Sequence, residues 1–260
     1  MEQTIKAVFF DVDGTLLSHT LNDVPKSARE ALKKLQDNGI KIIVATGRHM
    51  IEYRKLPVAD IPFDGYLTLN GNLMLDENKR MYAGTHIDYG EMEVLARIFE
   101  ADKIPSVFIG ENTRYINYIN DTVIKTQEET KGTVPDVGEW YGENIYQILA
   151  FIPNSYKEKL NVFLDQCEVT SWNDNGLDII PKGGGKAAGI QKYLDKYGVK
   201  QEETMAFGDA ENDIEMLKFV GIGVAMGNAS DSVKEIADYV TADIDDDGIE
   251  KALKHFGLID

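Results

Sequence analysis

Short apolar runs that stop at polar residues or glycine recur in the first part of the chain. Residues 7–10 form one such run, and residues 42–45 and 66–69 form two more. Runs of this length without alternation predict strands that are buried on both faces. Between the first two runs, residues 28–35 place their apolar side chains on one face of a predicted helix. Strand, helix and strand with short joins predict parallel pairing through a right-handed crossover.

The end of the chain repeats this arrangement. Its apolar patterns predict three helices, at residues 190–197, 214–217 and 233–237, of which the last is the final clear helix of the chain. They also predict three short strands, at residues 205–207, 222–225 and 239–240. The two ends of the chain therefore share one pattern of alternating strands and helices, as expected for two halves of a single parallel-sheet domain.

The middle of the chain, from about residue 73 to residue 180, mixes short strands with helices. The predicted strands lie at residues 73–75, 80–82, 106–110, 114–119, 145–152, 169–172 and 177–180, and the predicted helices at residues 92–99 and 156–164. Runs of strands between helices indicate a separate α+β layer. We therefore expect an α/β fold in which a parallel-sheet core, residues 1–82 and 183–260, is split by an inserted α+β domain, residues 83–182.

Composition narrows the function classes. The 260 residues include 27 basic and 44 acidic side chains, and the net charge is −17. Such a surface repels nucleic acid and anionic membranes, so we expect neither as a partner. The N-terminus lacks the basic start of a signal peptide and no apolar run reaches the length of a membrane span, so we expect a cytoplasmic protein. An anionic substrate would need a local cation or a metal ion.

Polar groups follow three of the predicted strands. These groups are Asp11 and Asp13, then Thr46, Gly47 and Arg48, and finally Asp209, Asn212 and Asp213. In an open parallel sheet, ligands bind beyond the carboxyl ends of the strands. Three strand ends with such side chains therefore predict one shared site.

The first strand is followed by two carboxylates two residues apart, Asp11 and Asp13. Mg²⁺ prefers oxygen ligands and keeps water and substrate phosphate among them. One oxygen of Asp11 can bind the metal ion while the other attacks phosphorus, because the cation cancels the repulsion between carboxylate and phosphate. Asp13 can then protonate the leaving oxygen and later accept a proton from water. Gly14 lets the backbone turn, and the hydroxyl of Thr15 can hydrogen-bond a nearby carbonyl or carboxylate.

A solvated turn or a calcium loop would also place acids after this strand. An EF-hand needs a helix before its loop and a third ligand after Asp13, whereas here a strand precedes and Thr15 follows the glycine. The acidic run at residues 243–248 also begins like a calcium loop. Its twelfth position is Lys254, where a bidentate glutamate is required, so we interpret this run as a solvated acidic turn.

Two further motifs are suited to binding phosphate. Thr46 and Gly47 offer a hydroxyl and an exposed backbone N–H, although a helix N-cap would use the same residues. We expect the neighbouring Arg48 to be structural or peripheral. Lys186 follows three glycines and opens a predicted helix, where its ammonium can neutralise a phosphate and orient the nucleophile. A flexible linker with a surface lysine is the alternative. A P-loop is excluded, because that pattern needs Gly at position 180 and Ser or Thr after the lysine, where this sequence has Ile180 and Ala187.

The segment after residues 205–207 supplies the remaining acids. Asp209 is nearest to the strand and is the better direct metal ligand, whereas Asp213 would bind through water or support the other ligands. Asn212 can donate to a phosphate oxygen. A helix N-terminus rich in acids would explain one or two of these residues but not the set.

Together these motifs resemble the four motifs of the haloacid dehalogenase superfamily, and the insertion between the second and third is similar to that of its Cof-type phosphatase subfamily. The residues that carry the resemblance are Asp11-Val12-Asp13-Gly14-Thr15, Thr46-Gly47-Arg48, Lys186, and Gly208-Asp209 with Asn212-Asp213. The chain departs from many relatives at Gly185, where they have Ser, and at Ala210, where they often have Gly. The resemblance implies a Rossmann-like core with a mobile α+β cap inserted after the third core strand.

The resemblance also implies a role for each of these residues. Asp11 is implied as the nucleophile and Asp13 as the acid and base. The ligands implied for Mg²⁺ are Asp11, the backbone carbonyl of Asp13, and Asp209, with Thr15 and Asp213 in support. The groups implied to hold the phosphoryl group are the backbone of Val12, Thr46, Gly47, Lys186 and Asn212. The implied substrates are small phosphomonoesters such as sugar phosphates.

Two other functions remain open from the sequence. A phosphomutase would use the same aspartyl-phosphate but return the phosphoryl group to another hydroxyl, and a non-catalytic module would bind a phosphorylated ligand without turnover. We expect the inserted domain to set substrate choice, because it must close over the leaving group. Asn117, Tyr118 and Trp172 are candidates there, and the sequence indicates no oligomeric state.

Overall fold

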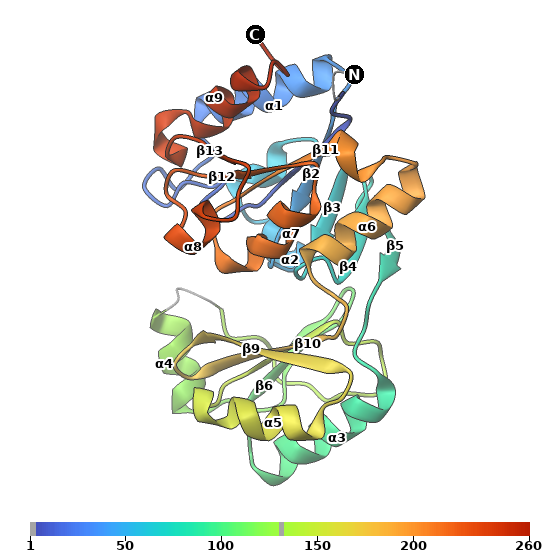
Figure 1. The fold of residues 1–260 in the computed structure, drawn as a ribbon. Helices are drawn as coiled ribbons and strands as arrows, with labels where there is room; N and C mark the ends of the chain where they lie inside the picture. Colours follow the sequence, from blue (N-terminus) through green and yellow to red (C-terminus); the bar gives the residue numbers. More distant parts are fainter. Residues whose placement is uncertain (1–3, 130–132) are drawn as a thin grey trace. The chain divides into compact units, whose positions relative to one another are not determined.

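The chain divides into two compact units. A computed structural model describes residues 4–129 and 133–260, and the ribbon is shown in Figure 1. The first unit comprises Met1–Ala83 and Gly185–Asp260, and the second comprises Gly84–Gly184. The inserted segment therefore forms a unit of its own, with its own apolar core.

An eight-stranded sheet forms the centre of the first unit, in the order β13-β12-β11-β1-β2-β3-β4-β5. Its strands are β1 (Ala7–Phe10), β2 (Lys41–Ala45), β3 (Gly65–Thr68), β4 (Leu73–Asp76), β5 (Met81–Gly84), β11 (Thr204–Gly208), β12 (Ile222–Ala225) and β13 (Tyr239–Val240). The strands from β13 to β3 are parallel, and β4 is antiparallel to β3. The expected α/β fold with a parallel-sheet core is confirmed, with two further strands at one edge.

Helices cover both faces of this sheet (Figure 1). Val8 and Phe10 of β1 pack in one cluster with α1 (Lys26–Asp37), α2 (Met50–Tyr53) and α9 (Gly248–His255). Ala7 and Phe9 point to the other face and pack with α6 (Lys186–Tyr197), α7 (Ile214–Phe219) and α8 (Asp231–Lys234). Successive strand residues point to opposite faces, so a strand covered on both sides must be apolar throughout.

The registers of β1 align the carboxyl ends of three strands. Phe10 lies beside Val44 of β2 and beside Phe207 of β11. The rings of Phe10 and Phe207 stack, with centroids 5.1 Å apart. The chain segments that leave these three strands therefore start next to one another, although β1 ends at Phe10 and β11 ends only at Gly208.

The strands expected at residues 73–75 and 80–82 are β4 and β5, and they extend the core sheet within the part of the chain expected as core, residues 1–82. One expectation about the first unit is wrong. Residues 233–237 are not the last helix, since α8 ends at Lys234 and α9 follows. The apolar face of α9 is buried, and Lys254 lies within this helix and not in a calcium loop.

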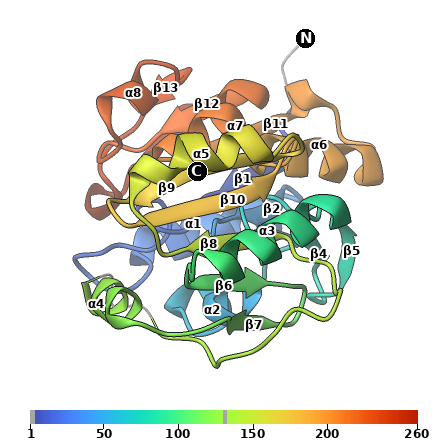
Figure 2. The same ribbon diagram turned by 90° about the horizontal axis from the view of Figure 1, so that it is seen from below.

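A five-stranded antiparallel sheet forms the second unit, in the order β7-β6-β8-β10-β9. Its strands are β6 (Ser106–Ile109), β7 (Arg114–Ile116), β8 (Gln147–Ala150), β9 (Cys167–Asn173) and β10 (Gly176–Pro181). Figure 2 shows α3 (Tyr89–Ala101) and α5 (Lys157–Phe163) side by side against one face. Their side chains pack on Ile148, Val169 and Ile179 of the sheet. This confirms the expected α+β architecture of the insertion.

Other segments of the described chain complete the two units. The helix α4 (Asp121–Glu129) in the second unit was not predicted. The short 3-10 helices are η1 (Pro57–Asp60), η2 (Asn154–Tyr156), η3 (Gln201–Glu203), η4 (Glu211–Asp213) and η5 (Ile244–Asp246). The strand expected at residues 114–119 ends at Ile116, because the Asn117 carboxamide accepts from the backbone N–H of Ser106 and donates to the carbonyl of Ile104. This contact turns the chain away from the sheet.

A carboxyl in the β10 strand predicts a pH-dependent stability. The Oδ1 atom of Asp178 is buried without a hydrogen-bond partner among the described residues, and burial raises the pKa of this carboxyl to about 6. Since the unfolded chain releases that proton near pH 3.9, the folded state loses stability as pH rises from about 4 to 7. We expect Asp178→Asn to raise the free energy of unfolding by about 2 kcal/mol at pH 7.5 and by almost nothing at pH 4.

Urea denaturation of both proteins at the two pH values checks this expectation. Asp174→Asn is the matched control, because Asp174 lies exposed in the adjoining turn between β9 and β10. It should change the free energy of unfolding little at either pH. An Asp178→Asn effect of equal size at both pH values would contradict a buried, proton-linked carboxyl.

Candidate active site

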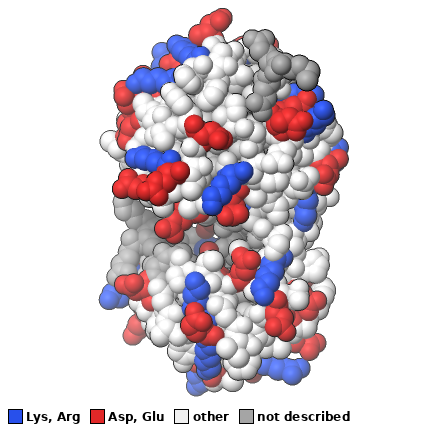
Figure 3. Space-filling view, in the orientation of Figure 1, with Lys and Arg blue, Asp and Glu red and all other residues white. Residues whose placement is uncertain are grey.

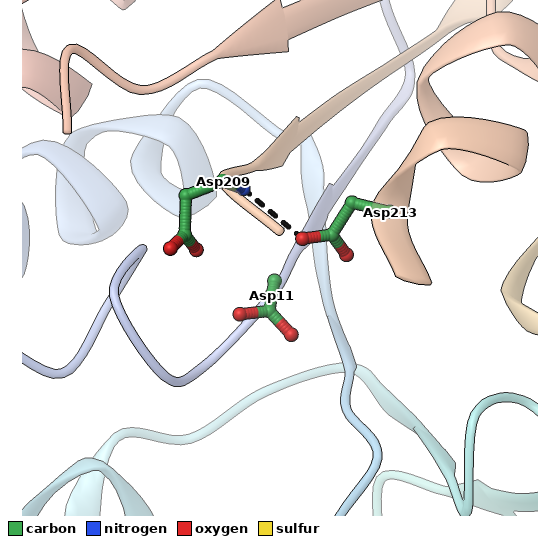
Figure 4. Close-up of side chains that lie close together, drawn as sticks. All are labelled: Asp11, Asp209 and Asp213. Carbon is green, nitrogen blue, oxygen red and sulfur yellow. Dashed lines mark hydrogen bonds between the residues drawn. The ribbon is translucent and has the colours of Figure 1, made fainter. Parts of the chain in front are cut away.

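Three carboxylates meet at the carboxyl edge of the first unit's sheet. Asp11 directly follows β1, Asp209 directly follows β11, and Asp213 ends the short helix η4. Figure 4 shows the three side chains gathered at one place. One oxygen from each lies within 4.8 Å of the other two. Carboxylates this close repel one another unless cations lie among them.

Backbone amides fix the Asp213 side chain in this group. Its Oδ2 atom accepts from the N–H of Asp209 at 3.0 Å and from the N–H of Ala210 at 3.1 Å. The first of these bonds is the dashed line in Figure 4. A Cβ atom at Gly208 would lie 2.5 Å from the Cβ of Asp213, so the end of β11 has to be glycine. The Asp213 side chain is fully buried.

The Lys186 ammonium supplies the protein's own cation. Lys186 is the first residue of α6 and is only 2% exposed. Its Nζ atom lies 2.5 Å from Oδ1 of Asp11 and 2.6 Å from Oδ1 of Asp213. Burial alone would lower the pKa of this ammonium, but the two carboxylates outweigh burial and raise the pKa, so Lys186 stays protonated. The preceding residue, Gly185, has a φ of 96°, which glycine adopts without strain.

The two strand-end carboxyls have raised pKa values. Burial raises the pKa of Asp11 well above its usual value, and the attraction of Lys186 offsets only part of this. Burial also raises the pKa of Asp209 to about 6, although Oδ1 accepts a hydrogen bond from the Thr15 hydroxyl at 2.8 Å. A Cβ atom at Gly14 would lie 2.3 Å from Oδ2 of Asp209, so this turn needs glycine. A divalent cation would favour the charged form of both carboxyls.

Asp13 lies outside the group of three carboxylates that lie within reach of one metal ion. Its carboxylate forms a two-point ion pair with Arg48, with Nε 2.7 Å from Oδ2 and Nη2 2.8 Å from Oδ1. Arg48 was expected to be structural or peripheral, but it contacts a candidate catalytic side chain directly. The pairing of β1 with β2 brings the two residues together, and nothing in the local sequence of either indicates it.

The candidate phosphate-binding groups lie on the same edge of the sheet. Thr46 is buried, and its hydroxyl accepts from the N–H of Arg48 at 3.1 Å, as in a local turn. Gly47 lies next to Asn70, because a Cβ atom at Gly47 would be 3.1 Å from the Asn70 Oδ1. The Asn212 amide donates to this same oxygen at 3.1 Å. Val12 is fully buried within the turn after β1.

Two asparagines near these groups were not identified from the sequence as site residues. Asn70 follows β3, and Asn228 follows β12, so both occupy strand ends like Asp11 and Asp209. The Asn228 amide donates to the carbonyl of Gly14 at 2.8 Å and ties down the loop after Asp11. A polar residue two or three positions after a core strand was the signal that could have found both.

The candidates in the second unit have different surroundings. Asn117 is engaged in backbone hydrogen bonds within that unit. Tyr118 lines a cavity of about 600 Å³ together with Phe99, Phe108 and Trp140. The side chain of Trp172 lies outside the described part of the chain. The structure therefore gives Asn117 a structural place within the second unit.

Figure 3 shows acidic and basic side chains interspersed over the face that it presents. Within the described residues, no helix has the length and the apolar character needed to span a membrane.

Comparisons with known proteins agree with the sequence motifs. A family model of haloacid dehalogenase-like hydrolases matches residues 8–253. The chain is 32% identical over 260 residues to 5-amino-6-(5-phospho-D-ribitylamino)uracil phosphatase YcsE of Bacillus subtilis, with 98% of this chain and 96% of that protein covered.

Two solved structures are similar over nearly the full chain. One is BT1666 from Bacteroides thetaiotaomicron, a phosphatase of the HAD superfamily, with a TM-score of 0.91 and 34% identity over 99% of this chain and 97% of that one. The other is the HAD subclass IIB sugar phosphatase BT4131, with a TM-score of 0.83 and 36% identity over 98% of this chain and 100% of that one.

Proposed function

The chain belongs to the haloacid dehalogenase-like hydrolases, and on this premise we propose that it is a Mg²⁺-dependent phosphatase that hydrolyses small phosphomonoesters through an aspartyl-phosphate on Asp11. The resemblance noted in the sequence is thereby confirmed at the level of the family and of phosphate-ester hydrolysis. The observation that carries the proposal is the contact of the buried Lys186 ammonium with Asp11, beside the carboxylate of Asp209.

The donor set fits Mg²⁺. Three carboxylates within 4.8 Å offer the hard oxygen ligands that this ion prefers. We assign Asp11, Asp209 and the backbone carbonyl of Asp13 as the groups that would hold it. Both oxygens of Asp213 already have partners, so this residue would support the site through Lys186 and the backbone. When bound, Mg²⁺ would neutralise charge on the phosphoryl group and the carboxylates.

The chain's own residues would carry out the transfer in two steps. A carboxylate oxygen of Asp11 attacks phosphorus, and the bond from phosphorus to the leaving oxygen breaks as Asp13 protonates that oxygen. Water then attacks phosphorus, Asp13 accepts its proton, and phosphate leaves with Asp11 regenerated. Lys186 fixes the Asp11 carboxylate and offsets the charge of the phosphoryl group. Arg48 pairs with both oxygens of the Asp13 carboxylate, so this ion pair would have to open before Asp13 carries the proton that it gives to the leaving oxygen.

The remaining assignments follow the sequence motifs. The groups proposed to hold the phosphoryl group are the backbone of Val12, Thr46, Gly47, Lys186 and Asn212. Residues 1–82 and 183–260 would form the catalytic core, and residues 83–182 a cap that selects the substrate. The similar phosphatases act on a sugar phosphate and on a phosphoribitylamino compound, as their names state. Both are small phosphomonoesters, which we propose as the substrate class here.

A phosphate-release screen tests this function. With Mg²⁺, we expect free phosphate from at least some members of a panel of sugar and polyol phosphates, and we expect EDTA to reduce the rate at least about 100-fold. Restoring Mg²⁺ should restore the rate, and Mg²⁺ alone should raise the temperature of unfolding, because it binds the folded site. An isomerised sugar phosphate without free phosphate would indicate a phosphomutase. Binding of a phosphomonoester without turnover would indicate a non-catalytic module. Full turnover in the presence of EDTA would contradict the proposed dependence of the reaction on Mg²⁺.

A further inference from the structure

The turn between β3 and β4 has a strained backbone. Leu69, Asn70 and Gly71 follow one another with φ values of 52°, 53° and 80°, all in the left-handed region. Glycine adopts this region freely and asparagine tolerates it, but a leucine there costs about 1–2 kcal/mol. Leu69 is nevertheless buried in the core. Strain of this kind persists only where the surrounding structure enforces it, and it is concentrated at functional sites.

The strained turn is held between the two segments that carry the candidate phosphate-binding groups. The N–H of Asn70 donates to the carbonyl of Thr46 at 2.9 Å, and the N–H of Leu69 donates to the carbonyl of Arg48 at 3.2 Å. On its other side, a Cβ atom at Gly71 would lie 2.6 Å from the carbonyl oxygen of Gly185. The turn thus spans the distance from the segment after β2 to the start of α6, where Lys186 lies.

The side chain of Asn72, which follows this turn directly, also lowers the stability of the fold. Asn72 is fully buried, and neither polar atom of its side chain has a hydrogen-bond partner in the described part of the chain. An unpaired buried amide costs about 1–3 kcal/mol. Strain and unpaired polar atoms in one turn indicate that its conformation serves a purpose other than stability.

The Asn70 carboxamide connects two groups that are proposed to hold the phosphoryl group. Its Oδ1 atom accepts from the Asn212 amide at 3.1 Å. A Cβ atom at Gly47 would lie 3.1 Å from Oδ1 and 3.4 Å from Nδ2 of Asn70, so this carboxamide lies against the Gly47 backbone. Asn212 itself lies exposed in the three-residue helix η4 and needs an external contact to fix its amide.

We propose that Asn70 is a positioning residue for phosphoryl transfer, whose carboxamide holds the Asn212 amide in the direction of the phosphoryl group. The inference rests on the proposed function, in which Asn212 and Gly47 contact that group. Asn70 acts through Asn212 and does not touch the reacting atoms. Asparagine suits both requirements of the position, because it tolerates a left-handed backbone and offers an acceptor for an amide.

Replacing Asn70 by glycine separates these two requirements. Asn70→Gly keeps the left-handed backbone without strain but removes the acceptor for Asn212. We expect kcat/KM to fall about 10- to 100-fold, less than for direct loss of a transition-state donor, while the temperature of unfolding stays close to that of the wild type. Lys79→Gly is the matched control, because Lys79 has a φ of 60° in the turn at the opposite end of β4. It should leave kcat/KM unchanged.

A double-mutant cycle tests whether Asn70 acts through Asn212. If it does, Asn70→Gly combined with Asn212→Ala should lose no more activity than Asn212→Ala alone. Wild-type kcat/KM in Asn70→Gly, or two losses that multiply in the double variant, would overturn the inference. The temperature of unfolding of each variant shows whether a loss of activity comes from a loss of fold.

Binding of inorganic phosphate separates this inference from the proposed function. Titration calorimetry with Mg²⁺ and inorganic phosphate requires no turnover, and we expect Asn70→Gly to weaken phosphate binding about 10-fold. A wild type that binds phosphate without hydrolysing any ester would refute the proposed function, and the effect of Asn70→Gly on affinity would still decide the inference. Equal phosphate affinity in the wild type and Asn70→Gly would overturn the inference alone.

Discussion

Asp11→Asn is expected to abolish phosphate release and to leave the protein folded. The amide has the shape of the carboxylate but cannot attack phosphorus, so the covalent route is lost. Removal of a nucleophile of this kind costs roughly 10⁴-fold or more in kcat. Because Lys186 keeps its ion pair with Asp213, the buried ammonium retains a counter-charge in the variant, and we expect the protein to stay folded. Steady-state phosphate release and circular dichroism measure the two effects.

Trapping the intermediate makes this test more specific. The wild type, quenched in acid during turnover of a labelled phosphomonoester, should retain label on the protein, and Asp11→Asn should retain none. Asp246→Asn is a suitable control, since Asp246 is an exposed carboxylate paired with Lys251 on the surface. It should release phosphate and trap label like the wild type. Turnover of Asp11→Asn at the wild-type rate would contradict the nucleophilic role.

The ends of the core strands were predictable because burial on both faces restricts which amino acids such a strand can contain. Such a strand must be short and apolar, and it stops where the chain leaves the sheet and can become polar again. The runs before Asp11 and Asp209 follow this rule, and the structure places β1 and β11 side by side. The three glycines before Lys186 likewise indicated a turn into a helix, and Gly185 does adopt a left-handed φ.

Contacts that depend on strand register were not predictable in the same way. The ion pair between Arg48 and Asp13 exists because β1 and β2 are aligned and the arginine side chain is long. A local pattern in the sequence specifies neither condition. Asn70 was missed for another reason, since its position requires a left-handed conformation at Leu69 that the propensity of leucine opposes. A strained turn is a place where sequence rules fail because the surrounding structure overrides them.

The helices that were missed are short or follow a misleading segment. The buried face of α9 includes Ile249, Ala252 and Leu253, in a helix of eight residues that makes little more than two turns. The acidic run at residues 243–248 leads into this helix, and its sequence begins like that of a calcium loop. In the structure Asp243 instead caps η5, and Asp245 accepts a hydrogen bond from the Ser18 hydroxyl. These acids therefore connect the end of the chain to the loop after β1.

Lys186→Met is expected to destabilise the protein more than any other single change at the site. Methionine keeps most of the volume of lysine but leaves the buried carboxylates of Asp11 and Asp213 without their ammonium. Removing one partner from a buried ion pair costs about 3–5 kcal/mol, because the remaining charges stay buried without compensation. We also expect kcat to fall at least about 10²-fold, since the cation that stabilises the phosphoryl group is lost. Urea denaturation and phosphate release measure these effects.

A second change distinguishes unpaired charge from lost packing as the cause. Combining Lys186→Met with Asp213→Asn removes one of the uncompensated carboxylates, so part of the lost free energy of unfolding should return, while activity should not. Mg²⁺ should also stabilise Lys186→Met, because a divalent cation would replace the missing charge beside Asp11. If Lys186→Met were as stable as the wild type, or if the double variant were no more stable than the single one, the ammonium could not be the charge that holds these carboxylates together.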